Sequence, residues 1–386
     1  MTNIFLFLGV TFLLIFIIGK LLEKIRIPWI FSALIIGAVM AIYNPFETIV
    51  KSQTFDFLAQ LGMYFLLFII GFQINLKKLK KCRGFVVRST FFIIFLEAIL
   101  GTILVHYIFG IYWFISFLVA LSFATVGEAI LIPILDEFKI INTKLGQSIL
   151  GIGILDDIIE VLLLIIIGVF IGTQVHSIIS IIVTLVSIFV LFLLTFGLKK
   201  LRPVGEEFKF TRIEVLFLLI IFILFIFIGI GDFAHIAPVA ALLAGVGLTT
   251  FIPKSRIKKI KTSTKTICYG FFAPIFFLWI GANMDFNYLI TAPLVVLIIV
   301  LVSISAKILG SYIIGKKELG TKKAILLGTG ISIRFSTSII IVKILFDSGL
   351  IQLELYSVII ASSIILTFLI PILFSKLLVR WKISKK

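Results

Sequence analysis

Charged residues are scarce in this chain. Only 14% of its 386 residues are charged, with 18 Asp and Glu against 35 Lys and Arg, whereas 61% are hydrophobic. This composition is too apolar for a soluble protein. The apolar residues form runs of about 20, the length at which an α-helix crosses a bilayer. A transmembrane β-barrel is excluded because it would need short alternating strands instead.

Cysteine is also nearly absent. Cys82 and Cys268 lie far apart and lack metal-type spacing, so we expect no disulfide, no metal held by cysteine and no cofactor. No low-complexity tract, soluble domain or cleavable signal peptide is evident. The formal charge of +17 could indicate nucleic-acid binding. We expect no such partner, because the basic residues lie in short loops between apolar runs.

The apolar runs predict an all-α polytopic membrane protein with about thirteen transmembrane helices and no separate soluble domain. The expected spans are residues 2–19, 28–43, 55–73, 85–107, 111–135, 144–172, 177–198, 212–230, 235–252, 266–284, 290–314, 322–346 and 354–379. Most Lys and Arg fall in alternate loops, and the intervening loops hold only Lys51. By the positive-inside rule, this alternation predicts a multi-pass cell-membrane protein with its N-terminus outside and its C-terminus in the cytoplasm.

Three sequence matches at nearly constant offsets of 208 to 210 residues indicate an internal repeat. They pair Ser32–Val39 with Ala240–Gly247, Phe68–Leu76 with Leu278–Phe286, and Ala98–Thr102 with Lys307–Ser311. The matches relate spans that are seven apart. An odd shift inverts one half in the membrane, as in many secondary transporters. We therefore predict a first inverted repeat at 1–172, a linker helix at 173–211 and a second repeat at 212–386, all within one transmembrane transporter unit.

The fifth and twelfth spans, which this offset also pairs, are poor continuous helices. The fifth contains Ser122–Glu128 and then Pro133, and the twelfth contains Gly328–Ser338, rich in Gly and hydroxyl residues. Such segments predict two crossing broken helices, because unwound backbone at membrane depth is tolerated only inside protein or beside a cavity. Ordinary packing of helices through small residues is the alternative.

The sixth span contains acidic residues where they are costly. Asp156 and Asp157 are adjacent in the run from Leu145 to about Gly172, and Glu160 follows one turn later. Intramembrane carboxylates almost always face a protein interior or a wet cavity and mark an ion or proton path. Neighbours on a helix differ by about 100°, so one aspartate can face such a cavity while the other meets an adjacent helix. A structural polar pair that joins helices is the alternative.

These features together resemble the sodium/proton antiporters of the monovalent cation:proton antiporter superfamily, and most of all the second cation:proton antiporter family. The resemblance rests on Asp156-Asp157, on Ala124–Gly127, on Gly281 and on Lys307. It implies a homodimer whose protomers have thirteen helices, a dimerisation domain and a core transport domain that moves by elevator-like alternating access.

The resemblance also implies roles for single residues. Asp157 is similar to the principal cation and proton carboxylate, Asp156 to the partner of Lys307, and Thr125 to a further cation ligand. Asp157, Asp156 and Thr125 are thus the expected oxygen ligands of the transported cation, which suits hard oxygen donors. The chain departs from many relatives at Arg334-Phe335-Ser336, where they have Arg-Gly-Glu, and at Glu128.

Glu128 and Arg334 are therefore the subject of a separate hypothesis. Each charge would be intolerable alone on an apolar helix face. We expect the two to pair at the crossing, so that Glu128 supplies the carboxylate absent at Ser336. The alternatives are that Glu128 pairs with Lys343 or becomes a third cation ligand.

The resulting prediction is an antiporter that exchanges Na⁺ or Li⁺ for H⁺ across the cell membrane and that moves net charge if Lys307 releases a second proton. A K⁺/H⁺ antiporter of the same superfamily and a sodium-coupled symporter of organic anions are the alternatives. We do not expect an enzyme. An intramembrane aspartyl protease would need Gly-X-Gly-Asp, whereas Gly151-Ile-Gly-Ile-Leu-Asp156 is two residues too long.

Overall fold

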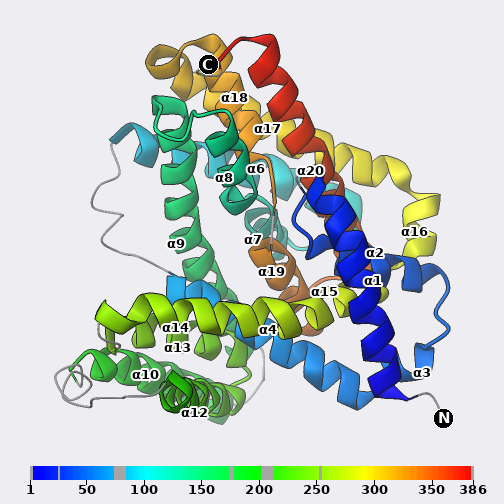
Figure 1. Ribbon diagram of the computed structural model, residues 1–386, viewed down its shortest axis with the longest axis vertical. Helices are drawn as coiled ribbons and strands as arrows, with labels where there is room; N and C mark the ends of the chain where they lie inside the picture. Colours follow the sequence, from blue (N-terminus) through cyan, green and yellow to red (C-terminus); the bar gives the residue numbers. More distant parts are fainter. Residues whose placement is uncertain are drawn as a thin grey trace. The chain divides into compact units, whose positions relative to one another are not determined.

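The computed structural model describes residues 3–24, 27–73, 84–173, 178–200, 213–251, 254–334 and 336–383, except for some side chains within these ranges, among them those of Glu128 and Ser336. All regular elements in these ranges are helical (Figure 1). Seven of the described helices are long and apolar enough to cross a membrane, and four apolar helices are shorter. The prediction of an all-α polytopic membrane protein is confirmed.

Contacts divide the chain into two compact units, and α1, α9 and α15 contribute residues to both. The first unit comprises residues 1–7, 46–75 and 161–279. Its helices are α3 (Glu47–Val50), α4 (Gln53–Gln73), α10 (Ile178–Lys200), α12 (Ile213–Asp232), α13 (Ala237–Phe251), α14 (Lys254–Ile267), the π-helical turn η1 (Cys268–Phe272) and most of α15 (Ala273–Ala282).

The second unit comprises residues 8–45, 76–160 and 280–386. Its helices are most of α1 (Ile4–Lys24), α2 (Phe31–Ile42), α6 (Gly84–Phe109), α7 (Trp113–Phe123), α8 (Glu128–Glu137), the first half of α9 (Lys144–Thr173), α16 (Phe286–Thr291), α17 (Pro293–Leu319), α18 (Thr321–Ile331), α19 (Ser336–Asp347) and α20 (Leu353–Arg380). Each predicted span coincides with a helix or, for the fifth and twelfth, with two half-helices.

One predicted loop is wrong. We expected a basic loop between the ninth and tenth spans, but residues 254–265 belong to helix α14, which runs through η1 into α15. The segment contains neither Gly nor Pro, and lysine is a good helix former. Its charge marks where an apolar span ends, but charge alone does not end a helix.

Within the first unit, α4 and α13 approach closely enough to bring their backbones into contact. A Cβ added at Gly71 would lie 2.1 Å from the carbonyl oxygen of Leu242, and one at Gly245 would lie 2.1 Å from that of Phe68. Only glycine permits such an approach, which is typical of helix packing in membranes.

Within the second unit, α2 and α15 make the equivalent contact. A Cβ added at Gly281 would lie 2.3 Å from the carbonyl oxygen of Leu34. Gly281 corresponds to Gly71 at an offset of 210, and Leu34 corresponds to Leu242 at an offset of 208. The same contact therefore occurs once in each unit between corresponding residues, which supports the internal repeat.

The two predicted broken helices are confirmed, and they cross within the second unit. The fifth span divides into α7 and α8, and the twelfth divides into α18 and α19 (Figure 1). At the crossing, the backbone N–H of Gly127 donates to the carbonyl of Ile333 at 2.8 Å. Backbone groups released by one break are thus partly satisfied by the other.

Candidate functional site

The turn between α7 and α8 leaves backbone N–H and C=O groups without partners in a helix, and side chains from other helices form hydrogen bonds with them. Asp156 is 1% exposed on α9, and its Oδ2 accepts a hydrogen bond from the backbone N–H of Val126 at 2.5 Å. The next residue on the helix, Asp157, is only half-buried. The two aspartates therefore have different surroundings, as their 100° separation requires: Asp156 binds backbone, and Asp157 is the more accessible carboxylate.

Lys307 is completely buried on α17, and its ammonium group joins both broken helices. It donates to the carbonyl of Thr125 at 2.7 Å and to the carbonyl of Ile331, at the end of α18, at 2.9 Å. An ion pair with Glu97 Oε2 at 3.4 Å completes its surroundings. Two hydrogen bonds to carbonyls and one ion pair thus hold the ammonium group.

Lys307 and Asp156 act on the same peptide unit. The Thr125 carbonyl that accepts from Lys307 and the Val126 N–H that donates to Asp156 belong to one peptide group. The positive charge lies at its oxygen and the negative charge at its N–H, so both polarise it in the same sense. Asp156 and Lys307, which we expected to pair, are thus linked through the Thr125–Val126 peptide group. Glu97 is an additional ion partner of Lys307.

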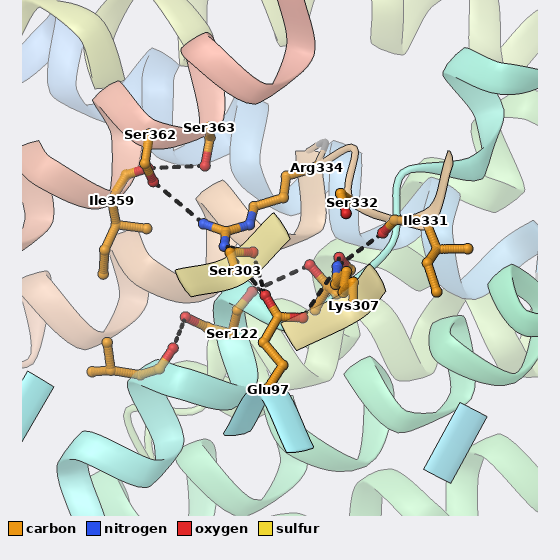
Figure 2. Close-up of polar contacts among 12 residues, drawn as sticks. Glu97, Ser122, Ser303, Lys307, Ile331, Ser332, Arg334, Ile359, Ser362 and Ser363 are labelled. Atoms are coloured by element: carbon orange, nitrogen blue, oxygen red, sulfur yellow. Dashed lines mark hydrogen bonds and ion pairs between the residues drawn. The ribbon is translucent and has the colours of Figure 1, made fainter. Parts of the chain in front are cut away.

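Glu97 of α6 lies between two buried cations (Figure 2). Its Oε1 is 3.4 Å from Arg334 Nη2, and its Oε2 is 3.4 Å from Lys307 Nζ. Ser303 bridges the first pair, because Arg334 Nη2 donates to its hydroxyl at 2.5 Å and that hydroxyl donates to Glu97 Oε1. All three ionic side chains are fully buried. Breaking such a pair leaves an uncompensated charge, which is strongly destabilising.

The remaining contacts of Arg334 fix the turn before α19. Its Nη1 donates to Ser362 Oγ at 3.3 Å, and Thr367 Oγ1 donates to the Arg334 carbonyl at 3.1 Å, both from α20. The guanidinium also lies 4.9 Å from the ring centroid of Phe123, the last residue of α7. Arg334 therefore ties the second broken helix to α20 and to the end of the first.

Sequence reasoning missed Glu97. The signal was present, because a carboxylate inside the apolar run 85–107 is costly and calls for a partner. We singled out the basic residues within spans and the acidic residues near the aspartate pair, but not this one. Which cation Glu97 meets depends on helix packing, since several carboxylates compete for Lys307 and Arg334.

Among the other expected site residues, those that the structure describes are buried or make local contacts. The Glu128 side chain lies outside the described residues, so the proposed pair with Arg334 stays a prediction; Arg334 has its ion pair with Glu97. Lys343 pairs with Asp347 on its own helix. Thr125 is buried, with its hydroxyl donating to the Ser122 carbonyl at 3.2 Å, and Glu160 is also buried.

Four buried charged side chains described at the crossing form one network. Lys307 and Arg334 supply two positive charges, and Glu97 and Asp156 supply two negative ones. Asp157 is a further carboxylate, partly exposed, whose charge a proton or a small cation can neutralise. Two crossed broken helices with buried charges and an accessible acid define a secondary active transporter of cations.

The chain belongs to the sodium/hydrogen exchanger family, whose transmembrane model matches residues 10–380. It is 30% identical over 385 residues to a probable Na⁺/H⁺ antiporter 3 of Methanocaldococcus jannaschii, covering 97% of this chain and 96% of that protein. It is 24% identical to the Na⁺/H⁺-K⁺ antiporter GerN of Bacillus cereus, with coverages of 92% and 90%. The solved sodium proton antiporter MjNhaP1 of Methanocaldococcus jannaschii shares the fold, with a TM-score of 0.63, 20% identity and coverages of 97% and 96%.

Proposed function

We propose that this protein exchanges Na⁺, or Li⁺, for H⁺ across the cell membrane. The observation that carries the proposal is a half-buried Asp157 directly after the buried Asp156, which binds the break of the fifth span through the N–H of Val126. Such a carboxylate is costly when it is both empty and ionised. Binding either a proton or a sodium ion removes that cost, so the two ions compete for the same oxygens.

In the proposed mechanism, Asp157 is the principal carboxylate, and Asp156 and Thr125 supply further oxygen ligands to the transported cation. When the core opens to one side, sodium displaces protons; when it opens to the other, protons displace sodium. As sodium binds, Asp157 releases one proton and Lys307 releases a second, so that two protons leave for each sodium ion and transport moves net charge. Alternation is elevator-like, with the two broken helices and their charges moving as one body.

The proposed setting follows the charge distribution of the loops. The N-terminus lies outside and the C-terminus in the cytoplasm, as the basic loops require. The protein works as a homodimer, and the repeat boundaries lie at 1–172 and 212–386, with residues 173–211 as the linker. Native mass spectrometry from lipid nanodiscs checks the oligomeric state, and a monomer alone would contradict it.

The test is transport by purified protein in liposomes that contain a pH-sensitive dye. Sodium, lithium, potassium and a bile-type anion are added in turn. We expect proton efflux with sodium and lithium, and an increased rate when valinomycin and potassium dissipate the membrane potential. Proton efflux with potassium but not with sodium would establish the second candidate, K⁺/H⁺ exchange. The similar GerN, which is named as a Na⁺/H⁺-K⁺ antiporter, favours this candidate. Cotransport of the organic anion would overturn both.

A further inference from the structure

Glu97 is a fully buried carboxylate at the crossing that the exchange mechanism above does not use. It lies on α6, outside both broken helices and on a different helix from the aspartate pair of α9. Yet it is the carboxylate in ion-pair contact with both Lys307 and Arg334. Lys307 binds a carbonyl in each broken helix, and Arg334 lies in the turn before α19, so Glu97 connects two cations that both hold the crossing.

The contacts define what each cation would lose without Glu97. Lys307 would keep its two carbonyl acceptors, Thr125 and Ile331, but would have no opposite charge within ion-pair distance among the contacts described for it. Arg334 would keep the hydroxyls of Ser303 and Ser362. The described part of the crossing would then keep both buried cations but lose one negative charge.

We propose that Glu97 is a positioning residue of the exchange: it holds Lys307 and Arg334 against the two broken helices, and its charge sets the pH range in which Asp156 and Asp157 trade protons for sodium. This inference rests on the proposed sodium/proton exchange. The groups that face Glu97 support it. Lys307 comes from α17 and Arg334 from the turn before α19, while α7, which also packs against α6, contains no titratable side chain. Helix α9, which contacts α6 between Gly151 and Val86, carries the acids Asp156, Asp157 and Glu160.

The expected direction follows from electrostatics. Removing the negative charge of Glu97 makes the crossing more positive, so both aspartates hold protons and sodium less tightly. Protons then block sodium binding only at lower pH. Glu97→Gln should move the acid limb of the pH–rate profile down by about half a pH unit or more, and should raise the KM for sodium several-fold at alkaline pH.

The variants separate this role from a merely structural one. Glu97→Asp keeps the charge, so it should keep the acid limb of the wild type even if its maximal rate is lower. Glu318→Gln removes one negative charge at an exposed position, where its partner is Lys144. This matched control should leave both the acid limb and the KM unchanged. A folded Glu97→Gln protein with the acid limb and KM of the wild type would overturn the proposal.

A second pair of variants decides the matter if Glu97→Gln does not fold. Lys307→Gln removes a positive charge and should move the acid limb to higher pH. Adding Glu97→Gln to it restores the charge balance and should return the limb towards that of the wild type. A double variant that keeps the limb of Lys307→Gln overturns the proposal.

All variants are measured as full-length protein in liposomes, with sodium-driven proton efflux followed at several pH values. The outcome also distinguishes the two levels of inference. A wild-type protein that exchanges no alkali cation for protons would refute the proposed function. A wild type that exchanges sodium, with Glu97 variants that do not shift its pH range, would refute the role of Glu97 alone.

Discussion

Both broken helices consist of two half-helices joined by an unwound turn, but the charged side chains that bind the two turns come from different places. The turn between α7 and α8, residues 124–127, contains no charged side chain, and its polar groups are bound by Asp156 from α9 and Lys307 from α17. The turn between α18 and α19 contains its own cation, Arg334. The repeat therefore accounts for the paired breaks, whereas the charges that stabilise them are particular to each.

This difference predicts which substitutions affect both broken helices and which affect only one. Lys307 donates to carbonyls of both broken helices, so its loss should affect both. Arg334 acts mainly on the second turn and reaches the first only through the ring of Phe123. The two cations share Glu97, yet they should differ in how much of the crossing depends on them.

Lys307→Ala should have the largest effect on stability. It removes one side of a buried ion pair and leaves the Thr125 and Ile331 carbonyls without their donor, a loss of about 3–5 kcal/mol. Thermal unfolding in detergent measures it, with the exposed Lys317 on the same helix as the matched control, Lys317→Ala. Equal melting temperatures for the two variants would contradict the contacts of Lys307.

Double-mutant cycles sharpen that result. Lys307→Ala should couple with Glu97→Gln more strongly than with Asp156→Asn, because the first pair is in direct ionic contact and the second acts through a peptide. Both coupling energies should exceed about 0.5 kcal/mol, the lower end for contacting or networked residues. Additive effects of Lys307 and Asp156 would show that the shared peptide transmits nothing between them.

Arg334→Lys should cost less than Lys307→Ala, about 2–3 kcal/mol. Lysine keeps the charge but lacks the planar fork that reaches Ser303 and Ser362 at once. Unfolding measurements check the amount. A loss as large as that of Lys307→Ala would mean that the second turn depends on its cation as much as the whole crossing depends on Lys307.

Ser303→Ala should be milder, with a loss of about 1–2 kcal/mol. It removes the hydroxyl that links Arg334 to Glu97, while the ion pair of 3.4 Å between these side chains remains. Transport should persist with the sodium KM of the wild type. An abolished exchange in a well-folded variant would place Ser303 in the ion path instead.

Lys144→Ala should have the smallest effect, below about 1 kcal/mol, because exposed ion pairs contribute little. Lys144 lies 2.5 Å from Glu318, and both side chains are about half exposed. The comparison with Lys307→Ala measures what burial adds to an ion pair in this protein. A loss of stability well above 1 kcal/mol in Lys144→Ala would contradict this expectation for exposed ion pairs.

Hydropathy and glycine patterns were sufficient for the thirteen spans and for the breaks near Thr125 and Ser332, because both depend on local composition. The partners of the buried charges were not accessible in this way. Lys307 is conspicuous as a cation inside an apolar run, but the sequence offers it three acids, Glu97 in the fourth span and Asp156 and Glu160 in the sixth. Only the packing of α6 against α17 shows that Glu97 is in ionic contact. The link through the Thr125–Val126 peptide depends on backbone orientation, which side-chain patterns do not encode.

The most direct test of the proposed exchange concerns Asp157, the partly exposed carboxylate next to the buried Asp156. Sodium-driven proton efflux is measured in liposomes for Asp157→Asn, which keeps the size and hydrogen bonding of the side chain but removes its titrating charge, with Lys144→Ala as the control. We expect that exchange is lost in Asp157→Asn while its thermal unfolding remains cooperative, and that the control transports normally. Near-normal exchange in a folded Asp157→Asn protein would contradict the account.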